Sequence, residues 1–105
     1  MTDKNQLNKE GNQHGYWEHC GTNGQLYSKG YYHNGERHGY WEEYWISGNL
    51  MYKGYYDNGK NHGYWEDYWN NGNLSYKGNY HNGRQIGLWE YYKYDGELKS
   101  QIFYS

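Results

Sequence analysis

Three histidines recur at one position of this 105-residue chain, and a histidine column of this kind could bind a metal ion. His14, His38 and His62 are 24 residues apart, so each belongs to one copy of a repeated unit. Zinc needs its ligands at about 2.0–2.1 Å from one ion. If each copy consists of two strands, successive copies lie ~9–10 Å apart. The column therefore predicts no metal site within one chain, and His33 and His81, next to turns, are expected to lie still further apart.

Recurring glutamates raise the question of general acid–base chemistry. Glu42 and Glu66 would lie ~9–10 Å apart by strand spacing, near the upper end of the roughly 6.5–9.5 Å between the carboxylates of inverting glycosidases. That mechanism needs two carboxyl groups with different pKa values, whereas identical repeats give both the same surroundings. Cys20 and His19 are adjacent strand residues, whose side chains point to opposite faces. These patterns predict a protein that is not an enzyme and has no cofactor.

All of these residues belong to a 24-residue phrase that occurs in four near-copies. Its clearest form begins His38-Gly39-Tyr40-Trp41-Glu42, and the copies start near residues 14, 38, 62 and 86. A fixed period in this range indicates a repeat architecture in which each unit packs on its neighbours. We predict one repeat domain over residues 9–105, after a polar lead over residues 1–8.

Glycines that follow a turn-forming residue divide the phrase into strands. Asn34-Gly35, Asn58-Gly59 and Asp95-Gly96 accept the positive φ angles of tight hairpin turns. The segments between turns are 9 or 11 residues long, rich in Tyr and Trp and free of proline, as is typical of strands. The fold class is therefore all-β, an antiparallel meander of about eight strands in a single layer.

The turns also predict a register. A two-residue turn at Ser47-Gly48 would pair three sets of residues, Trp41–Gly54, Glu42–Lys53 and Trp45–Leu50. A two-residue turn at Asn58-Gly59 would then place Tyr52 opposite Trp65. Residues directly opposite share a face, so one face collects the tryptophans, leucines and tyrosines that are identical in every copy. We predict that this face is buried and that a strand glycine leaves room there for each indole, at positions Gly30, Gly54 and Gly78.

The opposite face carries tyrosines and one glutamate–lysine pair in each full copy, namely Glu18–Lys29, Glu42–Lys53 and Glu66–Lys77. Solvated charge pairs of this kind contribute only ~0.2–1 kcal/mol each. A single-layer sheet cannot bury both faces, however, and an exposed patch rich in tyrosine commonly marks an interaction site. We therefore predict a partner-binding docking strip made of Tyr40, Glu42, Tyr44, Lys53, Tyr55, Tyr64, Glu66, Tyr68 and Lys77.

Composition narrows the class of partner. The net charge is −2, with 10 basic and 12 acidic residues mixed along the chain, so no basic run indicates nucleic acid or an anionic membrane. An aromatic fraction of 23% argues against disorder. The single Cys20 forms no internal disulfide, and no apolar stretch is typical of a signal peptide or membrane span. We predict a cytoplasmic protein that binds another protein.

Residues 54–80 read GYYDNGKNHGYWEDYWNNGNLSYKGNY. This run resembles the MORN-variant repeat, a β-hairpin unit of the MORN (membrane occupation and recognition nexus) type, and the resemblance covers about residues 9–104. It implies an elongated, twisted antiparallel sheet without catalytic residues. Such repeats occur as spacers, scaffolds and partner-binding modules, and some short bacterial members are antitoxins. The copies depart from the pattern at the ends, where Cys20-Gly21 replaces Tyr44-Trp45.

Three binding functions remain open. The first, favoured by the resemblance and the small size, is a bacterial or phage antitoxin, immunity-type protein or inhibitor that neutralises a toxin, effector or enzyme. It would dock through the strip or through a terminal edge strand at 98–103, which could also pair with a second copy. The second is binding of membrane phospholipid or a scaffold role, against which the lack of a basic cluster counts. The third is binding of choline or carbohydrate, as in bacterial cell-wall-binding repeats.

Overall fold

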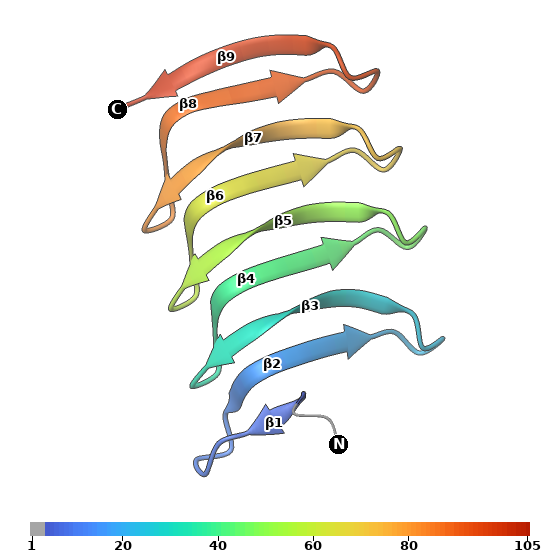
Figure 1. Ribbon diagram of the computed structural model, residues 1–105, viewed down its shortest axis with the longest axis vertical. Helices are drawn as coiled ribbons and strands as arrows, with labels where there is room; N and C mark the ends of the chain where they lie inside the picture. Colours follow the sequence, from blue (N-terminus) through green and yellow to red (C-terminus); the bar gives the residue numbers. More distant parts are fainter. Residues whose placement is uncertain (1–3) are drawn as a thin grey trace.

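The computed structural model describes residues 4–105 as one antiparallel sheet whose nine strands lie side by side in chain order (Figure 1). The strands are β1 (Gln6–Leu7), β2 (Gln13–Cys20), β3 (Leu26–His33), β4 (Glu36–Tyr44), β5 (Leu50–Asp57), β6 (Lys60–Tyr68), β7 (Leu74–His81), β8 (Arg84–Tyr92) and β9 (Leu98–Tyr104). The predicted meander is confirmed, with one strand more than the eight expected. The added strand, β1, lies within residues 1–8, where the sequence indicated only a polar lead.

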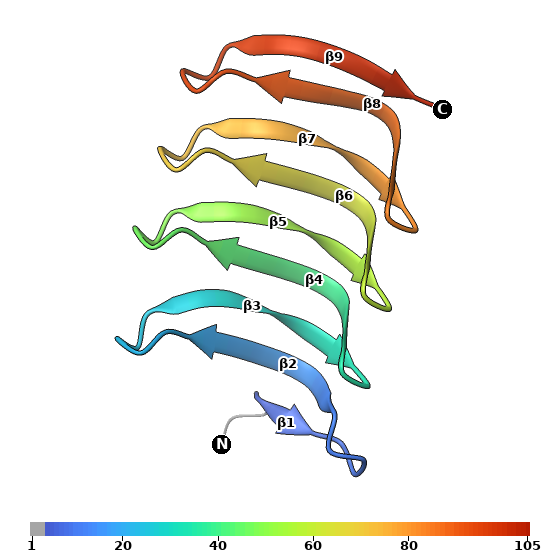
Figure 2. The ribbon, with the colours of Figure 1, turned by 180° about the vertical axis from the view of Figure 1, so that it is seen from behind.

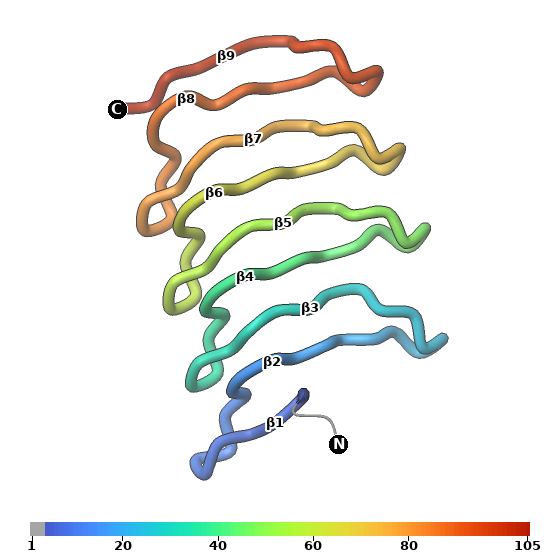
Figure 3. Tube along the Cα trace, viewed as in Figure 1, coloured from blue at the N-terminus to red at the C-terminus, as the bar shows by residue number. Residues whose placement is uncertain are grey.

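The sheet is a single twisted layer, 46 × 34 × 19 Å along its principal axes. Seen from the two sides in Figures 1 and 2, no other element covers either face among the described residues. The tube in Figure 3 shows two kinds of connection, tight turns at one end of the strands and wider loops at the other. Within residues 4–105 there is no helix that is long and apolar enough to cross a membrane.

The tight turns have the predicted two-residue form. Asn58 and Gly59 have φ angles of 49° and 85°, and the flanking residues Asp57 and Lys60 pair directly. Positive φ at both central residues identifies a type I′ turn, whose twist matches that of the strands. The Gly59 N–H also donates to the Arg37 carbonyl at 2.9 Å. Each tight turn is thereby tied to the hairpin before it, since Gly35 and Gly83 make equivalent bonds.

The wider loops differ from the prediction of a two-residue turn at Ser47-Gly48. The Gly48 N–H donates to the Trp45 carbonyl at 2.8 Å, and the Trp45 N–H donates to the Asn49 carbonyl at 2.7 Å. The loop therefore has three residues, and Gly48 adopts the positive φ of 95° that such a loop needs at its last position. The predicted pairing of Trp45 with Leu50 is wrong, because Leu50 pairs with Tyr44 after a register shift.

A second register shift follows each tight turn. Tyr52 was expected opposite Trp65, but it pairs with Asp67, and Gly54 pairs with Trp65. The shift arises because β6 holds extra residues around Gly63, which has a φ of 96°. Such a bulge bends the strand and increases its twist. Because the shift is by two residues, it preserves the faces, and the predicted sorting of side chains holds.

The core of the sheet is a column of tryptophans that lie flat on glycines. Trp41 and Trp89 are fully buried and Trp65 is 5% exposed. A Cβ atom added to Gly54 would lie 2.0 Å from Trp65 Cε3, and Gly30 and Gly78 face the following tryptophan in the same way. The predicted room for an indole is confirmed, and the structure adds that each indole covers the glycine of the preceding hairpin.

The other repeated residues on the tryptophan face are less buried than predicted. Leu50 and Leu74 are half-buried, and Leu98 at the end of the sheet is exposed. The tyrosines stand edge-on against the indoles, as in the Tyr32–Trp41 pair, where the ring centroids are 5.0 Å apart at 82°. In a sheet without a second layer, only the side chain that lies flattest is removed completely from water.

Candidate functional site

The docking strip predicted from the sequence is one continuous surface on the face opposite the tryptophans. All nine of its residues lie on β4 to β7, and cross-strand pairs connect them. Tyr40 pairs with Tyr55, Glu42 with Lys53, and Glu66 with both Lys53 and Lys77. The structure thus brings the predicted residues together, and their role in binding stays a prediction.

Each glutamate of the strip is held by two tyrosines of its own strand. Tyr40 donates to Glu42 Oε2 at 2.6 Å, and Tyr44 donates to the other oxygen, Glu42 Oε1. Glu66 receives the same two hydrogen bonds, from Tyr64 at 2.5 Å and from Tyr68. Side chains two residues apart share a face of a strand, so the Tyr-x-Glu-x-Tyr spacing in the sequence builds this clamp directly.

The lysines form ion pairs with the next repeat rather than with their own. The backbone register pairs Lys53 with Glu42, as predicted, but its ammonium lies 3.4 Å from Glu66 Oε1. Lys29 and Lys77 reach forward in the same way, to Glu42 and Glu90 at 3.5 Å. Acidic and basic groups therefore alternate across the sheet and neutralise one another. The charges of the strip link successive repeats, and of its tyrosines Tyr55 and Tyr64 are exposed to solvent.

The clamp shifts the acid–base equilibria of its members. Burial opposes ionisation of Glu42, yet the hydrogen bonds from Tyr40 and Tyr44 and the nearby Lys29 ammonium keep the pKa of Glu42 below its ordinary value. Glu66 is held ionised in the same way by Tyr64 and Tyr68. Burial and the adjacent carboxylate raise the pKa of Tyr40 and Tyr64. Each clamp is thus one charged carboxylate with two neutral phenols.

Beside the charged groups of this face lies a line of eight side chains, six of them aromatic, which we call the aromatic row. It crosses β2 to β9 in the order Tyr16, Tyr31, Tyr40, Tyr55, Tyr64, Asn79, Leu88 and Phe103. The paired rings Tyr40 and Tyr55 have centroids 5.4 Å apart. Between hairpins, Tyr31 and Tyr55 contact the bulge glycines Gly39 and Gly63, where an added Cβ would lie 3.6–3.7 Å away.

The row is apolar and open to solvent. Tyr31, Tyr55 and Tyr64 are 41–47% exposed, and Phe103 is 74% exposed. A small hollow of about 160 Å³ lies between Tyr40, Tyr55 and Tyr64, with the Lys53 stem and Gly54 in its wall. Exposed aromatic rings around a shallow hollow are typical of protein-binding surfaces, since they bury large area with few rotatable bonds.

Five members of the row were missed in the sequence, namely Tyr16, Tyr31, Asn79, Leu88 and Phe103. Tyr31 occupies the repeat position of Tyr55, so aligning the copies could have found it. Leu88 and Phe103 replace the tyrosines of that row in the last hairpin and pair with each other on β8 and β9. The change from tyrosine to an aliphatic residue and a phenylalanine hid them from a search for tyrosines.

The tryptophan face contains a second polar cluster, centred on Arg37. Its guanidinium carbon lies 4.1 Å from the ring centroid of Trp41, its Nη1 donates to the Tyr52 hydroxyl at 2.8 Å, and its Nη2 lies 3.6 Å from Glu43. The cation is therefore matched by a carboxylate and an aromatic face. The equivalent residues one repeat later are Asn61 and Asp67, so that repeat keeps the carboxylate and lacks the arginine.

Asp67 is the carboxyl group with the most unfavourable surroundings. Burial beside aromatic rings raises its pKa to about 6 from an ordinary 3.8, although hydrogen bonds from Tyr76 and Trp65 act in the opposite direction. A raised pKa means that the folded state binds the proton more tightly than the unfolded state, so stability falls as the pH rises from about 4 to about 6.

The change Asp67→Asn is therefore expected to stabilise the protein at pH 7.5 and to have no such effect at pH 3.5. The gain at pH 7.5 should be about 1 kcal/mol, smaller than the full shift implies because the group keeps contact with solvent. Urea unfolding at the two pH values measures it. Glu43→Gln is the matched control and should destabilise at pH 7.5, because Arg37 then loses its carboxylate. A stabilising control would contradict the assignment.

The histidine column has a structural role in the fold. Nδ1 of His38 accepts a hydrogen bond from the Asn58 N–H at 3.3 Å. In the same way, His14 accepts one from the Asn34 N–H and His62 accepts one from the Asn82 N–H, so that each histidine holds one tight turn. The His33 ring lies beside that of His14, with centroids 5.1 Å apart. Within residues 4–105, nevertheless, no three His, Cys, Asp or Glu side chains are grouped so that they could hold a metal ion.

The terminal strand β9 covers the edge segment 98–103 that the sequence singled out. It pairs with β8 on one side only, and Leu98 and Ile102 are 44–48% exposed. An unpaired edge offers backbone donors and acceptors to another chain. Self-association through this edge stays a prediction.

Comparison with known proteins agrees with this geometry. No curated protein and no solved structure matches the chain. The family model described as the MORN repeat variant matches three successive segments, residues 37–60, 61–82 and 85–105. These segments are more than half of the chain. Each begins two residues after the glycine of a tight turn. The chain therefore belongs to the MORN repeat variant family.

Proposed function

We propose that this protein is a non-catalytic module that binds another protein through the aromatic row and the docking strip beside it. The observation that carries the proposal is the aromatic row itself, in which four exposed rings, Tyr31, Tyr55, Tyr64 and Phe103, lie along one line across the sheet. Monomeric proteins seldom expose apolar patches of this extent without a partner. The single layer leaves this face free of any other part of the described chain.

The rigidity of the row supports this function. The clamped glutamates fix Tyr40 and Tyr64 on one side of the row through short hydrogen bonds, and the bulge glycines support Tyr31 and Tyr55 on the other. Side chains that are already ordered lose little conformational entropy on binding. A flat, preorganised aromatic surface suits a folded protein partner.

The finer role we propose is neutralisation of a toxin, effector or enzyme in the cytoplasm, as the resemblance to short bacterial members of the family suggests. A small sheet that covers the surface around an active site can inhibit an enzyme without chemistry of its own. Anionic phospholipid is a weaker candidate, because Lys29, Lys53 and Lys77 of this face are each neutralised by a glutamate and lipid headgroups need several free cations together.

Affinity capture from lysate of the source cell tests the proposal. The wild-type protein is compared with the triple variant Tyr31→Ser, Tyr55→Ser and Tyr64→Ser, whose side chains are exposed and outside the tryptophan core. The partner recovered by the wild type is purified, and its affinity for each protein is measured by calorimetry. The triple variant should bind at least about tenfold more weakly.

Tyr94→Ser is the matched control, because Tyr94 is as exposed as the row tyrosines but lies at a hairpin tip away from the row. It should bind like the wild type. Equal affinity of the triple variant would exclude the row as the docking surface. Measurement of the partner's own activity with and without this protein then tests neutralisation separately from binding.

A further inference from the structure

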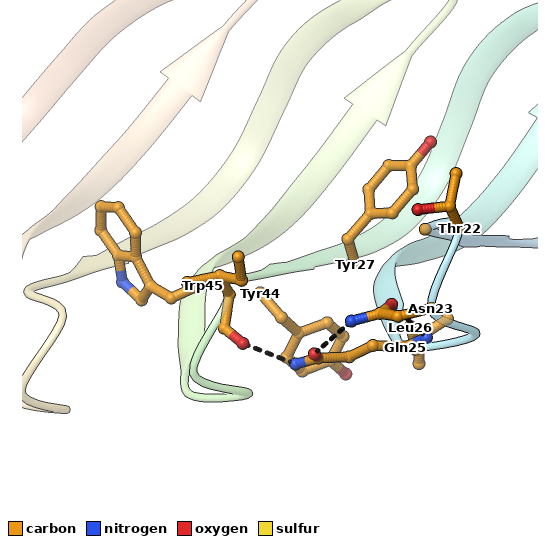
Figure 4. A pocket seen from close by; sticks show the side chains of 9 residues that line it. Thr22, Asn23, Gln25, Leu26, Tyr27, Tyr44 and Trp45 are labelled. Atoms are coloured by element: carbon orange, nitrogen blue, oxygen red, sulfur yellow. Dashed lines mark hydrogen bonds between the residues drawn. The ribbon is translucent and has the colours of Figure 1, made fainter.

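A hollow of about 360 Å³ opens between the tips of two successive hairpins, at the β2–β3 and β4–β5 loops (Figure 4). Its walls include Gly21, Leu26 and Tyr27 from the first hairpin and Tyr44 and Ile46 from the second. Gln25 bridges the two tips by donating to the Ile46 carbonyl at 2.7 Å. In the close-up, the Trp45 indole points away from Tyr27 and Gln25, toward the following hairpin.

Two repeats later, the equivalent space contains a tryptophan side chain. Trp69 directly follows β6, and its indole Nε1 donates to the Tyr92 carbonyl at 3.3 Å. The Trp69 ring also packs against Tyr94, with centroids 5.8 Å apart. The residues that correspond to Tyr92 and Tyr94, 48 positions earlier, are Tyr44 and Ile46. Leu26 and Tyr44 of the hollow therefore have identical counterparts beside Trp69, whereas Tyr27 and Ile46 stand where that site has Ser75 and Tyr94.

The indole is missing from the hollow because residue 21 is glycine. Gly21, Trp45 and Trp69 occupy the same repeat position. The φ of Gly21 lies outside the region that favours glycine, and an added Cβ would come no closer than 3.4 Å to any atom. Nothing in the backbone therefore requires glycine at this position. The empty place leaves apolar walls exposed, since Tyr27 is 48% and Ile46 is 92% exposed.

We propose that this hollow receives a tryptophan side chain of the partner protein, which stacks beside Tyr27 and Ile46 and donates its indole N–H to the Tyr44 carbonyl. The occupant is inferred from the chain's own Trp69, which donates to the Tyr92 carbonyl and packs against Tyr94, at the repeat positions of Tyr44 and Ile46. The proposal rests on the proposed function, since it requires a protein partner, and it gives that partner a second anchor at the hairpin tips. Buried tryptophans are frequent anchors of protein interfaces.

Two-dimensional NMR with N-acetyl-tryptophanamide as the probe tests the site without the partner. Saturable shifts are expected at Gly21, Thr22, Tyr27 and Ile46, and N-acetyl-leucinamide should produce none. Gly21→Trp should fill the hollow from within, raise the melting temperature and weaken probe binding at least about tenfold. Lys93→Trp is the matched control, because residue 93 has the same repeat position but no later hairpin among the described residues; it should leave probe binding unchanged.

Ile46→Ser provides a second variant that does not endanger folding, because Ile46 is almost fully exposed. It should also weaken probe binding. Absence of saturable shifts in the wild type would overturn the site, whether or not the aromatic row binds the partner. If the probe binds but Gly21→Trp leaves the affinity of the captured partner unchanged, the partner's tryptophan is not the occupant. If the triple variant of the aromatic row loses partner binding and Gly21→Trp does not, the result supports the proposed function and counts against the hollow as a second anchor.

Discussion

Replacing Trp41 by alanine is expected to lower the free energy of unfolding by about 3–5 kcal/mol. Trp41 is fully buried, and its Nε1 donates to the Tyr31 carbonyl at 2.8 Å. Its ring also lies against Gly30 and beneath the Arg37 guanidinium. Alanine would remove the contacts of two neighbouring hairpins at once. A loss of this size is a large share of the roughly 5–15 kcal/mol that stabilises a small domain.

Trp69→Ala is the control for this experiment. Trp69 is half-buried near a hairpin tip, away from the column of glycines, so its loss should cost clearly less than the loss of Trp41. Urea unfolding followed by tyrosine fluorescence and by circular dichroism measures both variants. Equal costs would show that stability is spread over all tryptophans, contrary to the column described above.

The hairpin order could be predicted because turns and strands are coded locally. Asn58-Gly59 accepts positive φ at both residues, so the type I′ turn and its two-residue length follow from the pair itself. Ser47-Gly48 carries a weaker signal, since only Gly48 needs positive φ, and a three-residue loop satisfies this as well as a two-residue one. The register at Trp45 and Leu50 was wrong for that reason.

The bulge at Gly63 could not be predicted from local propensity. A glycine inside a strand is compatible with a bulge, with a close approach of backbone, or with room for a neighbouring ring. Gly54 leaves room for the Trp65 ring, whereas Gly63 forms a bulge. The two glycines nevertheless have similar sequence surroundings. Only the three-dimensional packing of successive hairpins distinguishes them.

The sequence predicted that the strip residues share one face, but it did not predict how their charges pair. Alternation along the strands places Glu42 and Lys53 on one face, as expected. The sequence does not say which glutamate a lysine contacts, because each lysine strand lies between two glutamate strands. The forward choice, Lys53 to Glu66, depends on the twist between hairpins. That choice links each repeat to the next.

Gly54→Ala is expected to destabilise the protein by about 1–3 kcal/mol, the usual effect of overpacking a core. The new Cβ would lie 2.0 Å from Trp65 Cε3, and the indole cannot move away without leaving Tyr52, which stacks on it at 4.7 Å. Gly21→Ala is the matched control, because its Cβ would meet no atom closer than 3.4 Å. It should stabilise by about 0.4–1 kcal/mol, since alanine restricts the unfolded chain.

A double-mutant cycle identifies the cause of that effect. In a Trp65→Phe background the smaller ring leaves space above residue 54, so Gly54→Ala should cost less than in the wild type. The difference between the two costs is the coupling energy of the pair, and residues in contact give values of about 0.5–3 kcal/mol. A coupling energy near zero would place the strain in the backbone of β5 rather than against the indole. A large coupling would show that each hairpin of this sheet is fitted to the tryptophan of the next, so that the order of the repeats is itself held by packing.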